Sequence, residues 1–482
     1  MARVGGASGS PTVAAGLAVL GASGLVYLAV AARATGPAAF GDLTTLWTVV
    51  YTVGIGCFLP FEQELGRALA RRAVLGEGGR PVVLRAALAA GLLVLLLALA
   101  AVACAPASAG PLFSGDHGYL AVVLAASATM AAGHLTRGVF TGTAGTARGA
   151  GISGHAWYSG QLGAEGAVRT AACLALALLG CTAPMPYAWI LALAPAVAVA
   201  LTVPGVRPAL RPGPPAPWRE LSANLGWLIA GSVCAQAVAN VPVLAVAVLS
   251  GPADRESAGR FLAAVVLARV PVFAFQAVQA VLVPAWTRAL TLGDRTLFRR
   301  ELLRGLGAIA VLGVACAGVG GLAGPGLLRL TFGPRYGVGT LDLVALSLVG
   351  GCHMACLMFQ AGIVALGLHR FNAAGWAAGL AAFGAGCLVP LPVVPRVESA
   401  MALSAAVIAT LLGLRLRRAV TSAPRPATAR PARPARPERV SACSQPVLPR
   451  QGPVLARSWE RDARSPQESG ARRQGRDGLS QG

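Results

Sequence analysis

Residues 86–105 read AALAAGLLVLLLALAAVACA, a run of 20 residues without a single charge. A helix rises about 1.5 Å per residue, so this run spans about 30 Å, the thickness of the hydrocarbon core of a bilayer. The backbone must satisfy its own hydrogen bonds in lipid, and a helix does this within one segment. The run therefore predicts an α-helix that crosses a membrane.

Eleven other apolar stretches are separated from this one, and from each other, by short polar breaks. Most of them are long enough to cross the same hydrocarbon core. The sequence therefore predicts an all-α polytopic membrane protein with about 12 transmembrane helices. The other predicted spans are Val13–Ala32, Leu43–Phe61, Tyr119–Thr136, Gly163–Thr182, Met185–Val203, Leu225–Leu249, Phe261–Trp286, Leu306–Leu328, Leu343–Leu368, Ala373–Val393 and Ala400–Leu414.

The composition of the whole chain agrees with this prediction. Of the 482 residues, 55% are hydrophobic and only 12% are charged, and the mean hydropathy is +0.66. A soluble globular protein has about twice this fraction of charged residues, so the composition excludes a soluble enzyme. A membrane β-barrel is also disfavoured, because its strands alternate over about 10 residues and do not form long apolar runs.

The distribution of arginine predicts the orientation in the membrane. All 40 basic residues are Arg, and the net charge is +22. Outside the tail, 17 Arg lie before the first span or after even-numbered spans, and six lie after odd-numbered spans. The positive-inside rule then places both chain termini in the cytoplasm. Of the net charge, +10 comes from residue 415 onward, so the high charge does not indicate a nucleic-acid partner.

A Pro-rich stretch divides the predicted spans into two groups of six. It reads PGVRPALRPGPPAPW over residues 204–218. Gly36-Pro37-Ala38 follows the first span and Gly251-Pro252-Ala253 follows the seventh, which suggests an internal repeat of the kind that many transporters have. We predict a six-helix bundle at 1–203, a cytoplasmic linker at 204–220, a second bundle at 221–416 and a disordered Arg/Pro-rich cytoplasmic tail at 417–482.

Several short motifs resemble those of polysaccharide flippases, the lipid-linked-oligosaccharide exporters of the multidrug/oligosaccharidyl-lipid/polysaccharide superfamily. The stretch GPAAFG at 36–41 is similar to a signature that follows the first helix of these proteins. The order and spacing of the other motifs agree with the family over roughly residues 10–415. These motifs are EQELGRAL at 62–69, Arg137–Leu162, Gly251-Pro252 followed by Arg269-Val270-Pro271, and FGPRY at 332–336.

The resemblance implies a flippase in the bacterial plasma membrane. Such a protein moves polyprenyl-diphosphate-linked saccharide precursors across the cell membrane by alternating access, for the synthesis of cell-surface polysaccharide. Its partners would be the anionic lipid-linked substrate, membrane lipids, and possible polymerases or glycosyltransferases. The sequence contains no Walker loop, so no nucleotide or other cofactor is expected, and no enzymatic activity is implied.

A flippase requires a water-filled cavity between its two bundles, and ionisable groups inside the membrane are expected to face it. Arg269 is the clearest candidate, because it lies inside the eighth predicted span and a guanidinium can bind phosphate oxygens in a bidentate manner. Pro271 is expected to break the helix beside it. The predicted substrate-binding residues are Arg269, Arg169, Gln236, Asn240, Gln276 and Gln279.

Three acidic residues of the first predicted bundle are candidates for binding a coupling ion: Glu62 and Glu64 near the inner end of the second span, and Glu165 on the fifth. The alternative is that they form structural ion pairs. Glu64 lies three residues before Arg67, and Glu165 lies four residues before Arg169, and both spacings favour a pair on one helix face. No cluster of residues indicates a metal site.

Three other functions are compatible with a polytopic membrane protein. A cation-coupled multidrug exporter of the same fold is expected to carry acidic residues in its first helix, and the first span has none. A membrane glycosyltransferase or polymerase that uses prenyl-linked sugars is expected to have large external loops. The first predicted external loop, Arg33–Asp42, is only ten residues long. A scaffold without transport activity is the remaining alternative.

Overall fold

The computed structural model describes residues 10–113, 115–144, 152–221, 225–250, 255–272 and 294–421, together with residues 275, 282, 286, 289, 290 and 292. These residues form α-helices joined by short connections. The helices are α1 Ser10–Leu75, α2 Arg80–Phe113, α3 Gly118–Thr143, α4 Gly154–Leu178, α5 Pro184–Thr202, α6 Leu225–Leu249, α7 Arg255–Ala268, α9 Arg295–Leu322, α10 Gly324–Phe332, α11 Thr340–Ala365, α12 His369–Gly386 and α13 Val393–Thr421. Two 3₁₀ helices, η1 Val203–Leu210 and η2 Trp218–Leu221, connect α5 to α6.

The predicted all-α membrane fold is confirmed. Within the described ranges, eight helices are long enough and apolar enough to cross a membrane. One of them, α1, contains the first two predicted spans in a single helical stretch of 66 residues. The other predicted spans lie mainly on helices, but the ninth is divided between α9 and α10, the eleventh runs past the end of α12, and the eighth is described only in part. The protein is therefore a multi-pass membrane protein.

The connection between the first two spans differs from the sequence prediction. We expected a loop at Arg33–Asp42, but the structure is helical there except at Gly36. Gly36 has φ 78° and ψ 169°, a conformation that only glycine adopts without strain. One residue therefore turns the chain, and the two spans meet at a sharp kink.

Two other boundaries also differ from the prediction. The fifth span begins at Gly154 and not at Gly163, because the Ser153 side chain accepts a hydrogen bond from the backbone N–H of Ala156 at 3.2 Å and caps the helix. The last helix continues to Thr421, so the first five residues of the predicted tail, 417–421, are helical. The remainder of the predicted tail, residues 422–482, lies outside the described residues.

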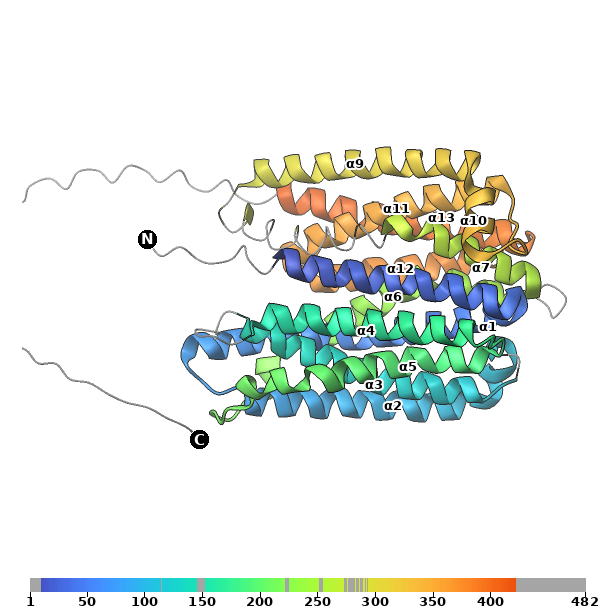
Figure 1. The fold of residues 1–482 in the computed structure, drawn as a ribbon. Helices are drawn as coiled ribbons and strands as arrows, with labels where there is room; N and C mark the ends of the chain where they lie inside the picture. The colour runs from blue at the N-terminus through green and yellow to red at the C-terminus, as the bar shows by residue number, and fades with distance from the viewer. Residues whose placement is uncertain are drawn as a thin grey trace, which may run out of the picture. The chain divides into compact units, whose positions relative to one another are not determined.

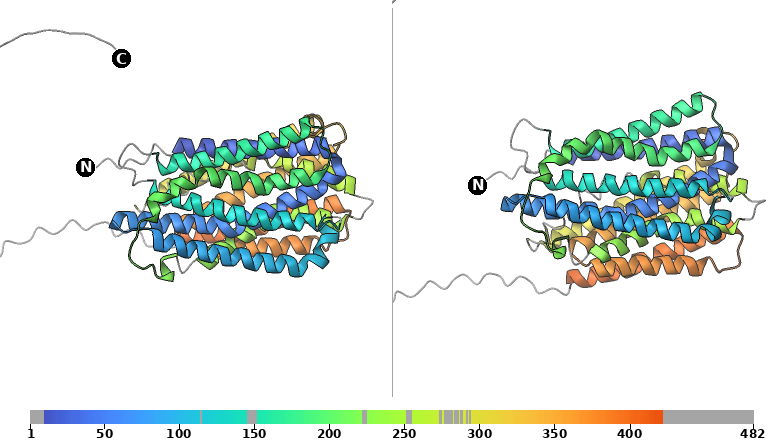
Figure 2. Two further views of the ribbon diagram at one scale, coloured as in Figure 1. Left: turned by 60° about the horizontal axis from the view of Figure 1, so that its bottom comes forward. Right: turned by 90° about the horizontal axis from the view of Figure 1, so that it is seen from below.

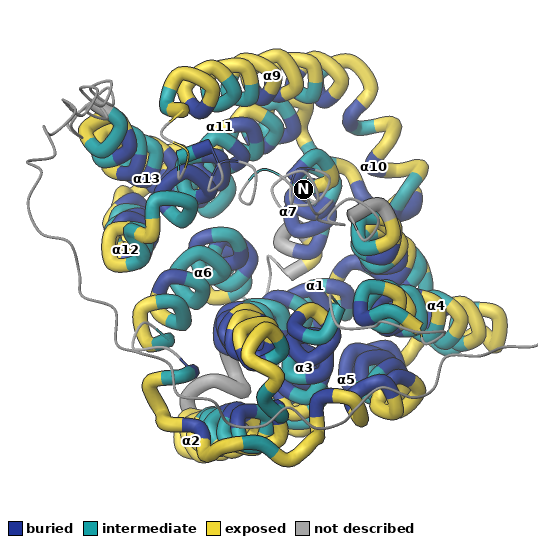
Figure 3. Tube along the Cα trace, turned by 90° about the vertical axis from the view of Figure 1, so that its left-hand side faces the viewer, coloured by how far each residue is buried: buried dark blue, intermediate teal, exposed yellow. Residues whose placement is uncertain are grey.

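The long helices run side by side (Figures 1 and 2). We call residues 10–221 the first half and residues 225–421 the second half. In the end-on view of Figure 3, α2 to α5 lie on one side, α9 and α11 to α13 lie on the other, and α1 and α6 lie between them. The start of α1 and the end of α13 lie at the same end of the helices (Figure 1), as an even number of spans requires.

The two halves contact each other near the middle of the helices, where α1 packs against α6. A Cβ atom added at Gly56 would lie 3.1 Å from the Cα atom of Val233, so the two backbones approach closely at this glycine. Close approach through small residues is typical of helix packing in membranes. Figure 3 shows buried residues on the faces of α1 and α6 in the interior.

Small residues of α12, spaced four apart, let this helix pack closely against α13. Gly375 and Gly379 face α13, and a Cβ atom at Gly375 would lie 2.5 Å from the side chain of Leu412. Nearer the end of the helix, a Cβ atom at Gly386 would lie 2.7 Å from the Cα atom of Ala400. The backbones of α12 and α13 are therefore in direct contact.

This contact makes Gly386→Ala a test of the packing. Because the new methyl group would meet backbone atoms, we expect the free energy of unfolding to fall by about 1–3 kcal/mol. Gly384→Ala is the matched control, since a Cβ atom there has nothing within 4 Å. Unfolding curves of the two variants in detergent provide the measurement, and equal stability of both would contradict the packing described.

Candidate functional site

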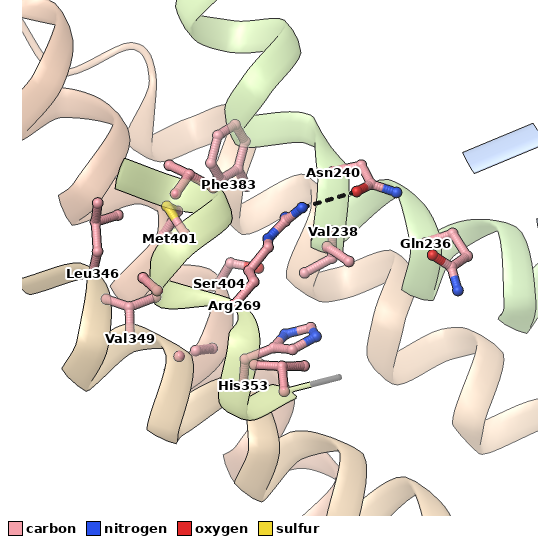
Figure 4. Close-up of a pocket in the computed structure, with 16 residues that line it drawn as sticks. Gln236, Val238, Asn240, Arg269, Leu346, Val349, His353, Phe383, Met401 and Ser404 are labelled. Carbon is pink, nitrogen blue, oxygen red and sulfur yellow. Dashed lines mark hydrogen bonds between the residues drawn. The ribbon is translucent and has the colours of Figure 1, made fainter. Parts of the chain in front are cut away.

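A cavity of about 100 Å³ lies inside the second half, near its border with the first (Figure 4). All of the residues that line it belong to helices of the second half or to the turn that follows α7. The sequence predicted a cavity between the two halves, whereas this cavity is lined by residues of the second half. The side chains that give the cavity its polar character are Gln236 and Asn240 from α6, Arg269 after α7, His353 from α11 and Ser404 from α13.

Arg269 lies immediately after the end of α7, where the chain makes a turn. Its backbone N–H donates to the carbonyl of Val266, three residues earlier, and not to the residue four positions back. Pro271 has no backbone N–H to continue the α-helical pattern, which explains the interruption that the sequence predicted. The turn directs the guanidinium of Arg269 into the cavity, as Figure 4 shows.

The guanidinium of Arg269 has a neutral partner. Its Nη1 donates a hydrogen bond of 3.1 Å to Oδ1 of Asn240, and Nδ2 of Asn240 donates one of 2.9 Å to Oγ1 of Thr52 in α1. None of the ion pairs formed within the described ranges contains Arg269. Arg269 is therefore a cation inside the membrane whose charge is not neutralised by a carboxylate in the described structure.

Two further cavity residues were not predicted from the sequence. The side chain of Ser404 is 1% exposed, and its Oγ has no hydrogen-bond partner in the described part of the chain. His353 lies near enough to Arg269 to interact with its charge, and its ring packs edge-on against Trp376. Both are polar residues within predicted apolar spans, and this could have marked them as candidates. Their place at the cavity, however, depends on which helices pack against each other, and the sequence alone does not reveal this.

A second cluster of polar side chains is buried within the first half. Glu62 of α1 is its centre, and its carboxylate accepts three hydrogen bonds. Oε2 accepts from Nδ1 of His134 at 2.8 Å and from Nε of Arg137 at 3.1 Å, and Oε1 accepts from the hydroxyl of Tyr158 at 3.0 Å. Glu62, His134 and Arg137 are each less than 9% exposed. We call this group, together with Glu165 and Arg169, the charge network.

Arg169 and Glu165 form the ion pair that their spacing predicts, with 2.5 Å between Nη2 and Oε1. A second Glu165 oxygen lies 3.9 Å from Arg137, which joins this pair to Glu62. The guanidinium of Arg169 also lies 5.7 Å from the ring centre of Trp47, a cation–π distance. Two carboxylates and two guanidinium groups therefore balance each other, as buried charges in membranes generally do.

Close packing of α1 against α3 makes the charge network possible. A Cβ atom at Gly138 would lie 2.8 Å from the backbone oxygen of Glu62, and one at Gly142 would lie 2.8 Å from the backbone oxygen of Gly66. These glycines bring the two helices together so that His134 and Arg137 reach Glu62. The fourth predicted span ends at Thr136, which would leave Arg137 in the cytoplasmic loop, but α3 continues to Thr143 and Arg137 is buried.

The structure thus separates the predicted site residues into groups. Arg269, Asn240 and Gln236 line one cavity, whereas Arg169, Glu165 and Glu62 lie together in the charge network. Glu64 pairs with Arg67 at 2.8 Å, the alternative that its spacing favours. Gln276 and Gln279 lie outside the described residues.

A scan of the sequence against protein-family models finds no match, and a comparison with curated proteins finds none. The fold, in contrast, is similar to that of solved transporters. The inward-facing conformation of a multidrug resistance MATE family transporter of the MOP superfamily matches at 15% identity with a TM-score of 0.61, over 83% of this chain and 95% of that chain. An outward-facing conformation with the same description matches at 14% identity with a TM-score of 0.59, over 86% and 94%.

The Vibrio cholerae MATE transporter VcmN in its bent form matches at 15% identity with a TM-score of 0.57, over 86% of this chain and 98% of that chain. Nearly the whole length of each transporter is therefore covered. At such identities the likeness establishes a fold shared with MATE transporters of the MOP superfamily, and the substrate has to be inferred from the side chains.

Proposed function

We propose that the protein is a transporter that moves polyprenyl-diphosphate-linked saccharide precursors across the cell membrane, for the synthesis of cell-surface polysaccharide. The observation that carries the substrate class is Arg269. An Arg in apolar surroundings without a carboxylate partner is costly, and an anionic ligand offsets that cost. A diphosphate supplies oxygen atoms in the geometry that a guanidinium binds best.

The other cavity residues suit the same ligand. Ser404 provides a buried hydroxyl that has no hydrogen-bond partner among the described residues, and His353 adds a ring that can donate or accept a hydrogen bond. Gln236 and Asn240 offer amides to phosphate or sugar oxygens. A volume of about 100 Å³ suits a phosphoryl group better than a whole saccharide, so we assign the cavity to the diphosphate. The prenyl chain would remain in lipid.

Alternating access is the mechanism that this fold supports. Inward-facing and outward-facing conformations are described for the similar MATE transporters. In this chain, Asn240 joins Arg269 to Thr52 of the first half, so a movement of α1 against α6 would alter the contacts of the guanidinium. Substrate binding and the movement of the halves would then be coupled through one hydrogen-bonded chain.

The energy for transport would come from the membrane potential or an ion gradient, because the sequence has no nucleotide-binding loop. Glu62 and Glu165 of the charge network are the buried candidates for ion coupling, and because Arg137 and Arg169 neutralise them, either would bind an ion only when its ion pair opens. Glu64 is the weaker candidate, because its partner Arg67 is half exposed. We assign Arg169 a structural role, since Glu165 neutralises it. Polymerases or glycosyltransferases are the expected partners on the product side.

Multidrug export is the second candidate function, because the similar structures are described as multidrug resistance transporters. A cationic drug needs a free carboxylate inside the membrane. Arg137 and Arg169 neutralise Glu62 and Glu165, and the cavity of the second half holds a cation of its own. The charges therefore favour an anionic substrate.

Ligand binding by the purified protein distinguishes the two functions. We expect a polyprenyl diphosphate to bind at least tenfold more tightly than the polyprenyl alcohol of the same length, measured by tryptophan fluorescence in detergent. The lipophilic cation tetraphenylphosphonium, a probe for drug sites, should show no saturable binding. Saturable binding of the cation together with equal affinity for the two prenyl compounds would contradict the proposed substrate class.

A further inference from the structure

Two motifs at the end of the helices opposite the chain termini contact each other across the two halves. One is the stretch GPAAFG at 36–41 with the end of the preceding span, and the other is FGPRY at 332–336 with the end of α10. The hydrogen bonds between them join residues 297 to 304 positions apart in the sequence. We call this the outer contact.

The polar part of the outer contact is made by Arg33 and Tyr336. Nε of Arg33 donates a hydrogen bond of 2.9 Å to the carbonyl of Thr331, and a second guanidinium nitrogen donates to the carbonyl of Leu330. These carbonyls belong to the last turn of α10, where a helix has no partners of its own and favours a cation. In return, the hydroxyl of Tyr336 donates a hydrogen bond of 3.0 Å to the carbonyl of Ala32.

The apolar part is a cluster of three aromatic rings. The ring of Phe40 lies 6.0 Å from that of Phe332 and 5.8 Å from that of Tyr336, which it meets edge-on. All three side chains are at most 2% exposed. Edge-to-face aromatic packing of this kind adds to the attraction from burial alone. The first and second halves therefore share one closed apolar core at this end.

Both motifs contain a Gly-Pro dipeptide at the point where the backbone turns sharply. Gly36 has φ 78° and ψ 169°, and Gly333 has φ 111° and ψ 169°. These conformations are nearly restricted to glycine. Each glycine precedes a proline, which disfavours a helical conformation at the glycine and so fixes the extended ψ. The same Gly-Pro dipeptide therefore shapes both sides of the outer contact.

The outer contact lies far from the place where the halves meet in the middle. From Phe40 to Thr52, which accepts the hydrogen bond from Asn240, the helix rises by about 18 Å. If the halves rock about the middle, as in transporters built from two bundles, the ends of the helices move the most. The outer contact has to separate whenever that end opens.

We infer that the outer contact is the gate on the side of the membrane opposite the chain termini, held closed by Arg33 and Tyr336. This inference rests on the proposed transport function, but it also makes a claim about movement that needs no substrate. Weakening the outer contact shifts the population of protein molecules towards the conformation that is open at that end. Cross-linking the outer contact stops the transport cycle.

Labelling of a buried cysteine measures the opening without substrate. In a chain whose native cysteines are replaced, Ala32→Cys adds one small sulfur at a position that is 0% exposed. We expect Arg33→Ala combined with Tyr336→Phe to raise the rate of its reaction with a membrane-impermeant thiol reagent at least tenfold. Arg329→Ala is the matched control, because Arg329 lies on α10, the helix that Arg33 contacts, and its side-chain hydrogen bond within the described structure goes to Pro325 of α10 itself. Equal rates in all three proteins would overturn the gate.

Cross-linking tests the gate in the transport cycle. We expect a short bifunctional thiol reagent that joins Phe40→Cys to Phe332→Cys to lower transport at least tenfold, and cleavage of the linker to restore it. The control joins Phe113→Cys to Tyr119→Cys, whose rings stack at 5.2 Å within the first half. Transport that continues with the outer pair joined would overturn the gate. If the unmodified protein transports no lipid-linked saccharide, the proposed function fails, and labelling at Ala32→Cys still decides the gate.

Discussion

Replacing Arg269 by alanine is expected to lower transport of the lipid-linked saccharide by about 100-fold or more, while the protein still folds and inserts. The guanidinium would form at least two charge-assisted hydrogen bonds to the diphosphate, each worth about 1.5–3 kcal/mol, and about 1.4 kcal/mol corresponds to a factor of ten. Stability should not fall, because within the described structure this buried charge has a neutral partner, Asn240, and no carboxylate. Complementation of a flippase-deficient strain, with the amount of inserted protein measured in parallel, provides the test.

Two variants make this result specific to the guanidinium. Arg269→Lys retains the charge but loses the planar fork, so we expect intermediate transport. Arg260→Ala removes a charge from α7, the helix that precedes Arg269, where Arg260 is 37% exposed and pairs at 2.5 Å with Glu256, which is 55% exposed. It should leave transport unchanged. Normal complementation by Arg269→Ala at an equal level of inserted protein would exclude Arg269 from the binding site.

The second large effect is expected for Glu62→Ala, on stability. The variant leaves the buried guanidinium of Arg137 without its closest carboxylate and removes the acceptor of His134 and Tyr158. Breaking a buried ion pair by removing one partner costs about 3–5 kcal/mol. We therefore expect a loss of this size in the free energy of unfolding, measured in detergent against the unmodified chain.

Glu64→Ala is the control, because Glu64 lies on the same helix and pairs with Arg67, whose side chain is 49% exposed. An ion pair of this kind contributes at most about 1 kcal/mol. Combining Glu62→Leu with Arg137→Met should recover much of the stability, because both buried charges are then removed together. A loss of less than about 1 kcal/mol for Glu62→Ala would contradict the description of the charge network.

The fold was predictable from the sequence because lipid restricts the choice of structure. An apolar run such as residues 86–105 has to be a helix in a bilayer, so the spans follow from composition and length. The ends of the helices were less predictable, because they depend on single residues. The chain turns at Gly36 alone, where a loop of ten residues was predicted. Ser153 caps a helix that begins earlier than the apolar run suggests.

The functional residues were predictable only where the signal lies within one helix. Arg269 stands out as a charge in an apolar span, and the pairing of Glu165 with Arg169 follows from their spacing. Contacts between helices were not predictable, since no local pattern tells which faces meet. His134 and Arg137 therefore read as isolated polar residues near the end of a span, whereas the close approach of α1 and α3 makes them partners of Glu62.

Reconstitution into proteoliposomes tests the central claim most directly. The measurement is the rate at which a fluorescent polyprenyl-diphosphate-linked saccharide crosses the bilayer, compared between the unmodified chain, Arg269→Ala and protein-free vesicles. We predict rapid translocation by the unmodified chain and the protein-free rate for Arg269→Ala. Equal translocation by both proteins, or export of a cationic dye without translocation of the saccharide, would contradict an anionic substrate bound by Arg269.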